Sequence, residues 1–494
     1  MILVNSSSKK TMGVFKSFLP VYVPVGCGYL LAVAHENGID MRFVDEQVTD
    51  DPLSIIESHV KTMSKPYIFG FSVVTAAYKS AIELSKALKE RYPQSFIVFG
   101  GIHPTAVPDE VLAHEHIDVV IRGEAEKTLN DFYRYIKAGQ TYTHLNGLSY
   151  RENGKIIHNR PGPVVSDLND LPAFPYHLFD DKKYNLSFIF SSRGCPYECI
   201  FCSNRIITGK KYRYRSAEST MEELELLFRE YGIRHVFFVD DNFIVNHKRA
   251  FKIIELIRKS GICGKMTFSF QGRADNFDYR LFKKLYETGF TSVDFGIETA
   301  SERIMKIINK GETVAECVKA VKAAKEIGLH VTSSFIYALP TETHQDRMDA
   351  IRLSKQLDID IVKFNNATPF PGTVLFEIAK KEGKLNIHGL YENFNSVSTI
   401  IENPFKKIPF SYIPAGNTEQ EIRRDIILSY MALWFNWKRM TKLLTKPSEG
   451  QGWFNAGESI IEKIRKVPPL FLLGGALMIK CLEALLSVPL AKKR

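Results

Sequence analysis

The amino-acid sequence predicts an α/β protein with two successive strand–helix series followed by a helical section. The chain has 494 residues, about three times a typical domain of ~150 residues, so it is long enough for two or three domains. Its 45% hydrophobic and 24% charged residues are typical of globular proteins and exclude collagenous and disordered classes. Short apolar runs alternate with segments of helical spacing over most of the chain, which favours parallel sheets.

Residues 1–147 form the first series, which we interpret as five strand–helix units. The expected strands are 2–4, 41–44, 67–72, 96–100 and 118–121, and the expected helices are 29–35, 54–63, 80–91 and 126–136. Such alternation predicts a doubly wound parallel sheet with its ligand at the carboxyl ends of the strands. The polar stretch 148–184 contains several Gly and Pro residues and is predicted to be an interdomain linker.

Residues 185–410 form the second series, and residues 411–494 have helical periodicity without strands. The expected strands are 187–192, 235–239, 266–270, 292–297, 330–337 and 361–366, with helices such as 217–231 and 313–327 between them. Six units are too few for a closed eight-stranded barrel, so they predict an open, partial (β/α)6 barrel. The chemistry of such a barrel gathers at the carboxyl ends of its strands.

Three of the seven cysteines, Cys195, Cys199 and Cys202, directly follow the first strand of the second series. The start of the chain lacks the charged and long apolar regions of a secretory signal, so we expect reduced thiols in the cytoplasm. Clustered thiols there indicate metal binding or catalysis. The isolated thiols are expected to be buried or incidental; they are Cys27, Cys263, Cys317 and Cys481.

The spacing of the clustered cysteines distinguishes two kinds of metal centre. A structural zinc site needs a fourth Cys or His at short spacing, and the nearest downstream candidate, His235, lies beyond the next thirty residues. Iron–sulfur cubes are usually held by four thiolates, so a loop with three thiolates leaves one iron open to an outside ligand. The loop therefore favours an iron–sulfur cluster with an open iron.

The segment Cys195-Pro-Tyr-Glu-Cys199-Ile-Phe-Cys202 resembles the motif of the radical S-adenosylmethionine (SAM) superfamily, including the aromatic residue Phe201 before the last cysteine. The resemblance implies that Cys195, Cys199 and Cys202 hold a 4Fe-4S cluster and that Phe201 belongs to the SAM site. It also implies that SAM chelates the open iron and is cleaved to a 5′-deoxyadenosyl radical. A one-electron donor such as flavodoxin or ferredoxin is expected.

Further strand ends match positions that bind SAM in this superfamily. Asp240 and Asp241 follow the second strand, where the superfamily carries a segment that binds the methionine amine, and Arg273 follows the third. Glu298 stands in Gly-Ile-Glu-Thr, similar to the superfamily's Gly-Ile-Glu-Ser, and is expected to bind the ribose or the amine. The alternative is that these carboxylates lie in solvated turns. After the fifth strand, Ala338 replaces a glycine that many relatives have, which argues against close backbone approach to SAM.

A doubly wound domain before this core resembles the cobalamin-binding subgroup, which includes anaerobic magnesium-protoporphyrin IX monomethyl ester cyclases and many methyltransferases. The resemblance covers about residues 1–410 and implies an N-terminal Rossmann-like cobalamin-binding domain. Cobalamin needs a glycine-lined channel for its nucleotide tail and small polar groups near the corrin. Residues of these types follow the third and fourth strands; they are Ser72, Thr75, Gly100 and Gly101.

The lower axial ligand of the cobalt is expected to be absent. Methionine-synthase-like domains supply a histidine from an Asp-x-His-x-x-Gly loop, and the place that we match to it, 45–50, has Gln47 instead. Gln47 is a poor cobalt ligand beside imidazole, so we expect base-off, His-off cobalamin. His103 is the alternative ligand, although a turn histidine beside Gly-Gly is more often structural. The segment Gly26-Cys-Gly28 has no third glycine at Leu31, which argues against a dinucleotide site.

Three functions fit these parts. The first is a methyltransferase that acts on an unactivated carbon of a small-molecule or lipid substrate, and the second is an oxidative cyclase without methyl transfer. A non-catalytic cobalamin or redox sensor is the third, but it gives no reason for acidic residues at the barrel mouth. A methylthiotransferase would need a second cluster, and the first series contains only Cys27.

The C-terminal section carries much of the positive charge. The net charge is +10, and residues 411–494 have 13 basic and 7 acidic side chains, which gives +6. Two uncharged runs, 426–437 and 467–479, lie beside Lys and Arg residues and are shorter than the ~20 residues of a spanning helix. They predict helices on an anionic membrane surface and a lipophilic substrate, unless both helices pack against the barrel. No recognised motif supports nucleic-acid binding.

Overall fold

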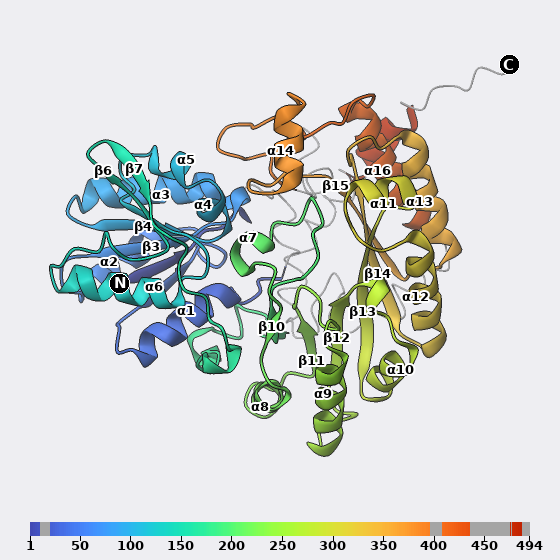
Figure 1. Ribbon diagram of the computed structural model, residues 1–494, viewed down its shortest axis with the longest axis horizontal. Helices are drawn as coiled ribbons and strands as arrows, with labels where there is room; N and C mark the ends of the chain where they lie inside the picture. The colour runs from blue at the N-terminus through green and yellow to red at the C-terminus, as the bar shows by residue number, and fades with distance from the viewer. Residues whose placement is uncertain (10–19, 396–407, 435–474, 476, 487–494) are drawn as a thin grey trace.

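The computed structural model describes residues 1–9, 20–395, 408–434, 475 and 477–486. It contains two large β-sheets that lie side by side, with α7 (Arg205–Thr208) and α14 (Val374–Lys381) between them (Figure 1). The N-terminal sheet is blue to teal in the figure, and the second sheet is green to orange. The predicted α/β class with two sheets is confirmed.

The N-terminal sheet has seven strands in the order β2-β1-β3-β4-β5-β6-β7, and the first five of them are parallel. The strands are β1 (Ile2–Asn5), β2 (Arg42–Asp45), β3 (Ile68–Ser72), β4 (Phe96–Gly100), β5 (Val119–Ile121), β6 (Leu148–Glu152) and β7 (Lys155–His158). The helices are α1 (Val25–Glu36), α2 (Pro52–Val60), α3 (Tyr78–Arg91), α4 (Ile102–Ala106), α5 (Pro108–Leu112) and α6 (Glu126–Lys137). The central strands are buried on both faces, as their continuous Ile, Val and Phe runs require.

The structure differs from the predicted linker 148–184. Its first part forms the hairpin β6–β7, which extends the N-terminal sheet in antiparallel orientation. Asn153 and Gly154 make the turn, with φ values of 50° and 75°. Two consecutive positive φ angles are those of a type I′ hairpin turn, for which Asn-Gly is the strongest sequence signal. The Gly and Pro content of the surrounding residues concealed this signal.

The second sheet has six parallel strands in the order β15-β14-β13-β12-β11-β8, and it is open at both edges. The strands are β8 (Phe188–Ile189), β11 (His235–Phe238), β12 (Thr267–Gly272), β13 (Phe290–Glu298), β14 (His330–Tyr337) and β15 (Ile361–Asn366). The helices that accompany them are α8 (Ala217–Arg229), α9 (His247–Lys259), α10 (Tyr279–Glu287), α11 (Glu302–Ile307), α12 (Val314–Ile327) and α13 (His344–Gln356). The predicted partial barrel is confirmed.

The predicted first strand of this series, 187–192, is divided. Its end forms β9 (Ser192–Arg193), which pairs with β10 (Arg213–Tyr214) outside the main sheet. The backbone N–H groups of Ser191 and Ser192 donate to Asp240 Oδ1 at 2.7 and 2.9 Å. Because these donors bind a side chain, they leave the sheet ladder and the chain turns toward the cysteine loop.

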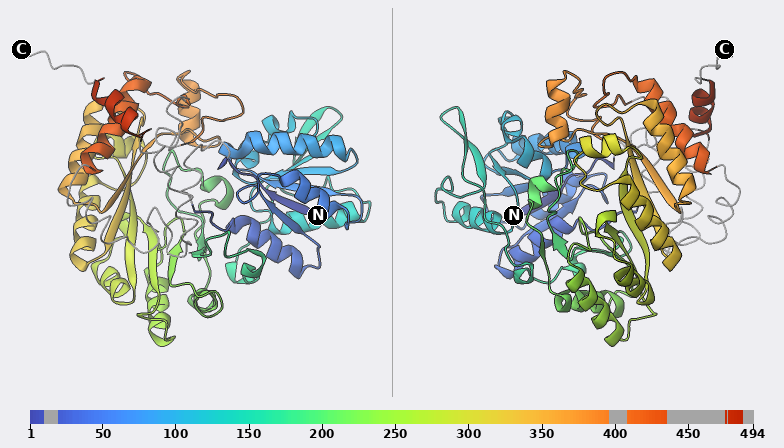
Figure 2. Two further views of the ribbon diagram at one scale, coloured as in Figure 1. Left: turned by 180° about the vertical axis from the view of Figure 1, so that it is seen from behind. Right: turned by 45° about the vertical axis from the view of Figure 1, so that its right-hand side comes forward.

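The C-terminal helix α16 (Glu419–Trp434) lies beside α13 (Figure 2). Ile422, Ile426 and Leu433 are buried at helical spacing, and the Tyr430 hydroxyl bonds the backbone of Phe364 in β15. The described part of the predicted membrane run 426–437 therefore packs against the barrel, which corrects the interfacial interpretation for 426–433. Residues 435–437, and all of 467–479 except 475 and 477–479, lie outside the described residues. Within the described ranges, no helix has the length and apolar character needed to cross a bilayer.

Candidate active site

The cysteine loop begins at Gly194, which follows β9. Gly194 has φ +86°, and a Cβ there would lie 2.3 Å from the Lys211 carbonyl oxygen, so only glycine fits this turn. Cys202 N donates to the Cys199 carbonyl at 3.2 Å, which closes the loop. Phe201 packs against the apolar core beside them.

The three clustered thiols lie close enough to affect one another. Burial raises the pKa of each thiol, and neighbouring thiols raise the pKa values of Cys195 and Cys202 further; the pKa of Cys202 rises to about 11. Such thiolates are stable only beside positive charge, and an iron–sulfur cluster provides it. The donor set of Cys195, Cys199 and Cys202 therefore fits the predicted cluster.

Arg273 supplies a cation next to the loop. Its Nη1 lies 3.9 Å from Cys199 Sγ, and its guanidinium lies 3.6 Å from the ring centroid of Tyr197. Asp275 fixes the guanidinium through two bonds of 3.0 and 2.9 Å. Arg273 is thus held in contact with the cysteine loop and faces the sulfur of one proposed ligand, while its contact with SAM stays a prediction.

A buried ionic network extends from Arg273 to the end of β13. Lys310 Nζ lies 3.2 Å from Glu298 Oε1 and 3.7 Å from Glu312 Oε1, and Glu312 lies 3.6 Å from Arg273. Burial alone would lower the pKa of Lys310, but the two carboxylates raise it above its ordinary value. Lys310 therefore stays charged beside Cys199, although nothing in the sequence singled out Lys310 or Glu312.

The two aspartates after β11 have different surroundings. Asp240 is fully buried, and both of its oxygens accept bonds from Ser191 and Ser192, so it supports the strand before the cysteine loop. The contact of Asp240 with SAM stays a prediction, because both of its oxygens already accept bonds from this strand. Asp241 is only partly buried, accepts from Asn204 Nδ2 at 2.6 Å and raises the pKa values of Cys195 and Cys202. Asp241 is thus the aspartate that faces the cysteine loop.

Two neighbouring strand ends of the second sheet have strained backbone. Glu298 and Ala338 both have φ +66°, a conformation that residues with a Cβ rarely adopt. Ala338 N donates to Glu342 Oε2 at 2.5 Å, and burial raises the pKa of Glu342 to about 8. Ala338 therefore has a backbone conformation that glycine adopts more readily than alanine. Strain of this kind gathers at functional sites.

A cavity of about 230 Å³ lies at the carboxyl ends of the strands in the N-terminal sheet. Ser72, Gly100 and Gly101, three of the residues expected to contact cobalamin, line this cavity. Gly101 has φ +95°, and a Cβ there would lie 2.8 Å from Val73 N and O. The apolar walls include Leu3 and Leu129. A cavity with glycine backbone on one side and apolar side chains on the other fits a flat, partly apolar group such as the tail of cobalamin.

A second cavity, of about 320 Å³, lies between the two sheets. Thr75 and Ile102 reach it from the N-terminal sheet, whereas Ser203 and Asn204 reach it from the cysteine loop. Phe370 and other residues after β15 complete its wall. Thr75, predicted to contact cobalamin, thus shares a cavity with the residues that follow Cys202.

The structure does not bring Gln47 to either cavity. Gln47 follows the edge strand β2, and its Nε2 donates to Asp45 Oδ2 at 3.3 Å. His103 is fully buried between Tyr78 and Tyr391, at ring-centroid distances of 4.2 and 4.9 Å. Neither residue lines the two cavities, so the predicted contact of Gln47 with cobalamin is not supported by its position.

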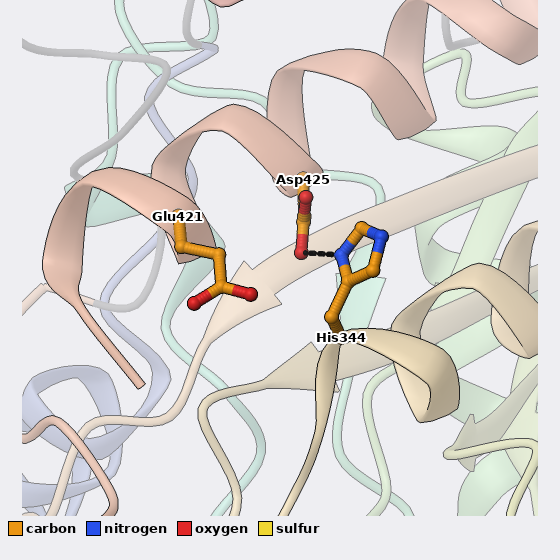
Figure 3. A group of neighbouring side chains, drawn as sticks. All are labelled: His344, Glu421 and Asp425. Carbon is orange, nitrogen blue, oxygen red and sulfur yellow. Dashed lines mark hydrogen bonds and ion pairs between the residues drawn. The ribbon is translucent and has the colours of Figure 1, made fainter. Parts of the chain in front are cut away.

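Another group of metal-ligand types lies on α13 and α16, namely His344, Glu421 and Asp425 (Figure 3). His344 Nδ1 lies 2.7 Å from Asp425 Oδ2. The buried guanidinium of Arg347 also lies 2.7 Å from Asp425 and 3.5 Å from Glu421. Because Arg347 already neutralises these carboxylates, we interpret the group as an ion-pair network that fixes α16 to the barrel.

Comparisons with known proteins match a family to each of the two sheet-containing parts of the chain. Residues 189–354 match the family model of the radical SAM superfamily, and residues 13–132 match that of the B12 binding domain. An uncharacterized methyltransferase of Pyrococcus horikoshii is 36% identical over 362 residues, which cover 72% of this chain and 78% of that protein. The anaerobic magnesium-protoporphyrin IX monomethyl ester cyclase of Cereibacter sphaeroides is 25% identical, with 78% of this chain and 64% of that protein covered.

Solved structures share the fold. The cobalamin-dependent SAM radical enzyme OxsB, with aqua-cobalamin and SAM bound, superposes with a TM-score of 0.70 at 17% identity and covers 98% of this chain and 71% of OxsB. The radical SAM methyltransferase TsrM of Kitasatospora setae, with cobalamin and a [4Fe-4S] cluster bound, has a TM-score of 0.63 at 19% identity, with 77% of each chain covered. The chain thus belongs to the family of cobalamin-dependent radical SAM methyltransferases, and its cofactors are SAM, a 4Fe-4S cluster and cobalamin.

Proposed function

We propose that this enzyme transfers a methyl group to an unactivated carbon of a small molecule that binds in the cavity between Thr75 and Asn204. The observation that carries the proposal is that this one cavity is lined both by the strand ends of the cobalamin-binding domain and by the cysteine loop. When bound, the cluster and SAM supply a radical that removes a hydrogen atom, and cobalamin supplies the methyl group.

The residues of the second sheet have distinct roles in this proposal. Cys195, Cys199 and Cys202 hold the cluster, and Arg273 and Lys310 place positive charge beside Cys199. Asp241 and Glu298 bind the amine and the ribose of SAM through charge-assisted hydrogen bonds. Asp240 acts indirectly, because it fixes the strand that leads into the loop.

The residues of the N-terminal sheet bind cobalamin without a lower histidine ligand. Ser72, Gly100 and Gly101, which line the first cavity, would hold the tail, and Thr75, which lines the second, would contact the corrin. Among the described residues that line the two cavities there is no histidine, and the ring of His103 is enclosed by Tyr78 and Tyr391. This supports base-off, His-off cobalamin.

Product counting tests the reaction. Each methyl transfer converts one SAM to S-adenosylhomocysteine and cleaves a second SAM to 5′-deoxyadenosine and methionine, with two electrons supplied one at a time by a donor such as flavodoxin or ferredoxin. The reconstituted enzyme is incubated anaerobically with cell extract and methyl-labelled SAM, and labelled products are identified by mass spectrometry. Methyl transfer predicts both SAM products and a labelled small molecule. Formation of 5′-deoxyadenosine without S-adenosylhomocysteine would instead support an oxidative cyclase, and no turnover would support a sensor.

Contact with an anionic membrane, and hence a lipophilic substrate, is a second proposal for the C-terminal section. It is supported by the exposed apolar side chains of the helix at 477–486; these are Met478, Ile479, Leu482, Leu485 and Leu486. Apolar side chains beside basic residues are typical of helices that lie in a bilayer surface. Sedimentation of the full chain with anionic liposomes, compared with a chain ending at Glu462, tests it. If both stay in the supernatant at low salt, the proposal is wrong.

A further inference from the structure

The cavity proposed for the cobalamin tail and the cysteine loop share one segment of chain, residues 190–195. Phe190 and Arg193 line the cavity, although they belong to the second sheet's side of the molecule. Cys195 follows Arg193 after the single residue Gly194. A ligand that fills the cavity therefore presses on the segment that leads directly to the first proposed cluster ligand.

Arg193 joins this segment to the N-terminal domain. Its side chain is only 11% exposed, and its Nη1 lies 2.7 Å from Glu126 Oε1 and 3.5 Å from Glu124 Oε1. Its guanidinium lies 5.3 Å from the ring centroid of Tyr29. Tyr29, Glu124 and Glu126 also line the cavity. Arg193 and the residues that it contacts thus form part of the cavity wall.

A second arginine fixes the same carboxylate from the neighbouring strand. Arg213 lies opposite Arg193 in the β9–β10 pair, and it donates to both oxygens of Glu124 at 2.9 and 2.5 Å. The carboxylates of Glu124 and Glu126 therefore balance the two guanidinium charges, and all four side chains are buried or nearly so. Loss of one member would leave a buried charge without its partner, so these side chains are expected to keep their contacts when a ligand fills the cavity.

The segment has little freedom to absorb a displacement before Cys195. Asp240 holds the N–H groups of Ser191 and Ser192, and Arg249 Nη2 donates to the Ser191 carbonyl at 3.0 Å. Gly194 is in contact with the backbone of Lys211. A shift of Arg193 is therefore transmitted to the loop rather than lost in a flexible turn.

We propose that Arg193 is a positioning residue that couples the cobalamin cavity to SAM binding at the cluster. Cobalamin in the cavity presses on Phe190 and Arg193 and holds Cys195 in the arrangement in which the cluster binds SAM. This inference rests on the proposed cobalamin and cluster sites. Because coupling between binding sites is reciprocal, SAM raises the affinity for cobalamin by the same factor.

The test measures SAM affinity in the full chain with a reconstituted cluster, by equilibrium dialysis with and without saturating hydroxocobalamin. We expect SAM to bind about tenfold more tightly with hydroxocobalamin, within the range of roughly 5- to 150-fold that is usual for coupled sites. A second readout is the electron paramagnetic resonance spectrum of the reduced cluster, which should change when hydroxocobalamin is added. In Arg193→Gln the affinity ratio should fall close to one, while each ligand still binds.

Matched variants separate coupling from folding. Glu126→Gln breaks the same bond from the N-terminal domain, so it should also lower the ratio of SAM affinities with and without hydroxocobalamin to about one. Adding Arg193→Gln to this variant should change the ratio no further. Lys79→Gln is the control, because the Lys79–Glu392 ion pair (3.1 Å) also joins the two parts of the chain but lines neither cavity. It should keep the tenfold ratio. Arg193→Lys retains the charge and provides a further variant if Arg193→Gln does not fold.

Two results would overturn the coupling alone. The first is equal SAM affinity with and without hydroxocobalamin in the wild type. The second is an affinity ratio as large as that of the wild type in both Arg193→Gln and Glu126→Gln. In either case cobalamin and SAM still bind, so the proposed function stands. If the wild-type chain binds no hydroxocobalamin, the proposed function is wrong and the coupling falls with it.

Discussion

The two sheets present their ligand-facing edges in different ways. The N-terminal sheet ends in small residues, and the cavity there is lined mainly by glycine backbone and apolar side chains, with the ion pairs of Arg193 in one part of its wall. The second sheet ends in buried charges, where Arg273, Glu298, Lys310 and Glu312 form a connected network. One edge is therefore suited to recognition by shape and the other to recognition by charge.

If the proposed sites are correct, the difference follows from the chemistry of the two cofactors. The tail of cobalamin is bulky and partly apolar, so close backbone approach matters more than charge there. SAM carries an amine, a carboxylate and a sulfonium, and the cluster adds charged thiolates. Buried ion pairs are costly to desolvate, so a fold retains such a network where charged ligands need it. Substitutions that remove a charge should thus reduce stability or activity most at the second sheet. Substitutions that add side-chain volume should do so most at the N-terminal sheet.

The largest effect is expected where the charged edge meets the cluster. Cys199→Ala removes one of three proposed ligands, so the cluster should be lost and formation of 5′-deoxyadenosine from SAM under dithionite should stop. Iron content and product are measured after anaerobic reconstitution. Cys263→Ala is the control, because Cys263 is an isolated thiol, and it should keep full activity. Normal turnover in Cys199→Ala would contradict the assignment.

Removing a buried charge should be the next most damaging change. Lys310→Met leaves Glu298 buried without its cation and leaves Glu312 with Arg273 alone, which is expected to cost about 3–5 kcal/mol of unfolding free energy. The midpoint of urea unfolding, followed by circular dichroism, measures this loss. Lys363→Met removes the half-exposed pair with Asp294 (2.9 Å) and should cost less than about 1 kcal/mol. Equal effects of the two variants would show that the network contributes no more than a surface pair.

The same contrast explains what could be predicted from the sequence. The strands and the cysteine loop were predictable because apolar runs and closely spaced thiols are local signals. Lys310 could not be found, since it lies 37 residues after Arg273 and meets the network only when the strand ends come together. Asp240 and Asp241 are adjacent, and sequence alone does not tell which of the two points into the core. The glycines that line the N-terminal cavity were easier to single out, because a single glycine already indicates a place where the backbone can approach a ligand closely.

Adding volume should damage the edge that recognises shape. Gly101→Ala places a Cβ 2.8 Å from the Val73 backbone at φ +95°, which is expected to cost about 2–4 kcal/mol and to weaken cobalamin binding at least tenfold. Thermal unfolding and hydroxocobalamin titration measure the two effects. Gly38→Ala is the matched control, since Gly38 also has positive φ (+71°) but open space around its Cβ. It should cost about 1–2 kcal/mol from backbone strain and leave cobalamin binding unchanged.

The smallest effect concerns the one histidine that could make the N-terminal edge a site of coordination. Burial lowers the pKa of His103 to about 3, and neither of its ring nitrogens has a hydrogen-bond partner among the described residues. Unfolded histidine takes up a proton below pH ~6.5, whereas His103 in the folded chain does not, so stability falls as the pH drops from 6.5 toward 3. At pH 5 this loss amounts to about 2 kcal/mol. His103→Phe keeps an aromatic ring between Tyr78 and Tyr391 and removes the loss.

Unfolding of both proteins at pH 7.5 and pH 5 measures this effect, and the stability of His103→Phe relative to wild type should rise by about 2 kcal/mol at the lower pH. The spectra of bound cobalamin distinguish the two roles of the residue. An enclosed, neutral His103 predicts identical cob(II)alamin spectra in both proteins, without nitrogen superhyperfine splitting. Splitting in the wild type that disappears in His103→Phe would make His103 the cobalt ligand. The N-terminal edge would then recognise its cofactor by a metal–ligand bond, and the contrast with the charged edge of the second sheet would no longer hold.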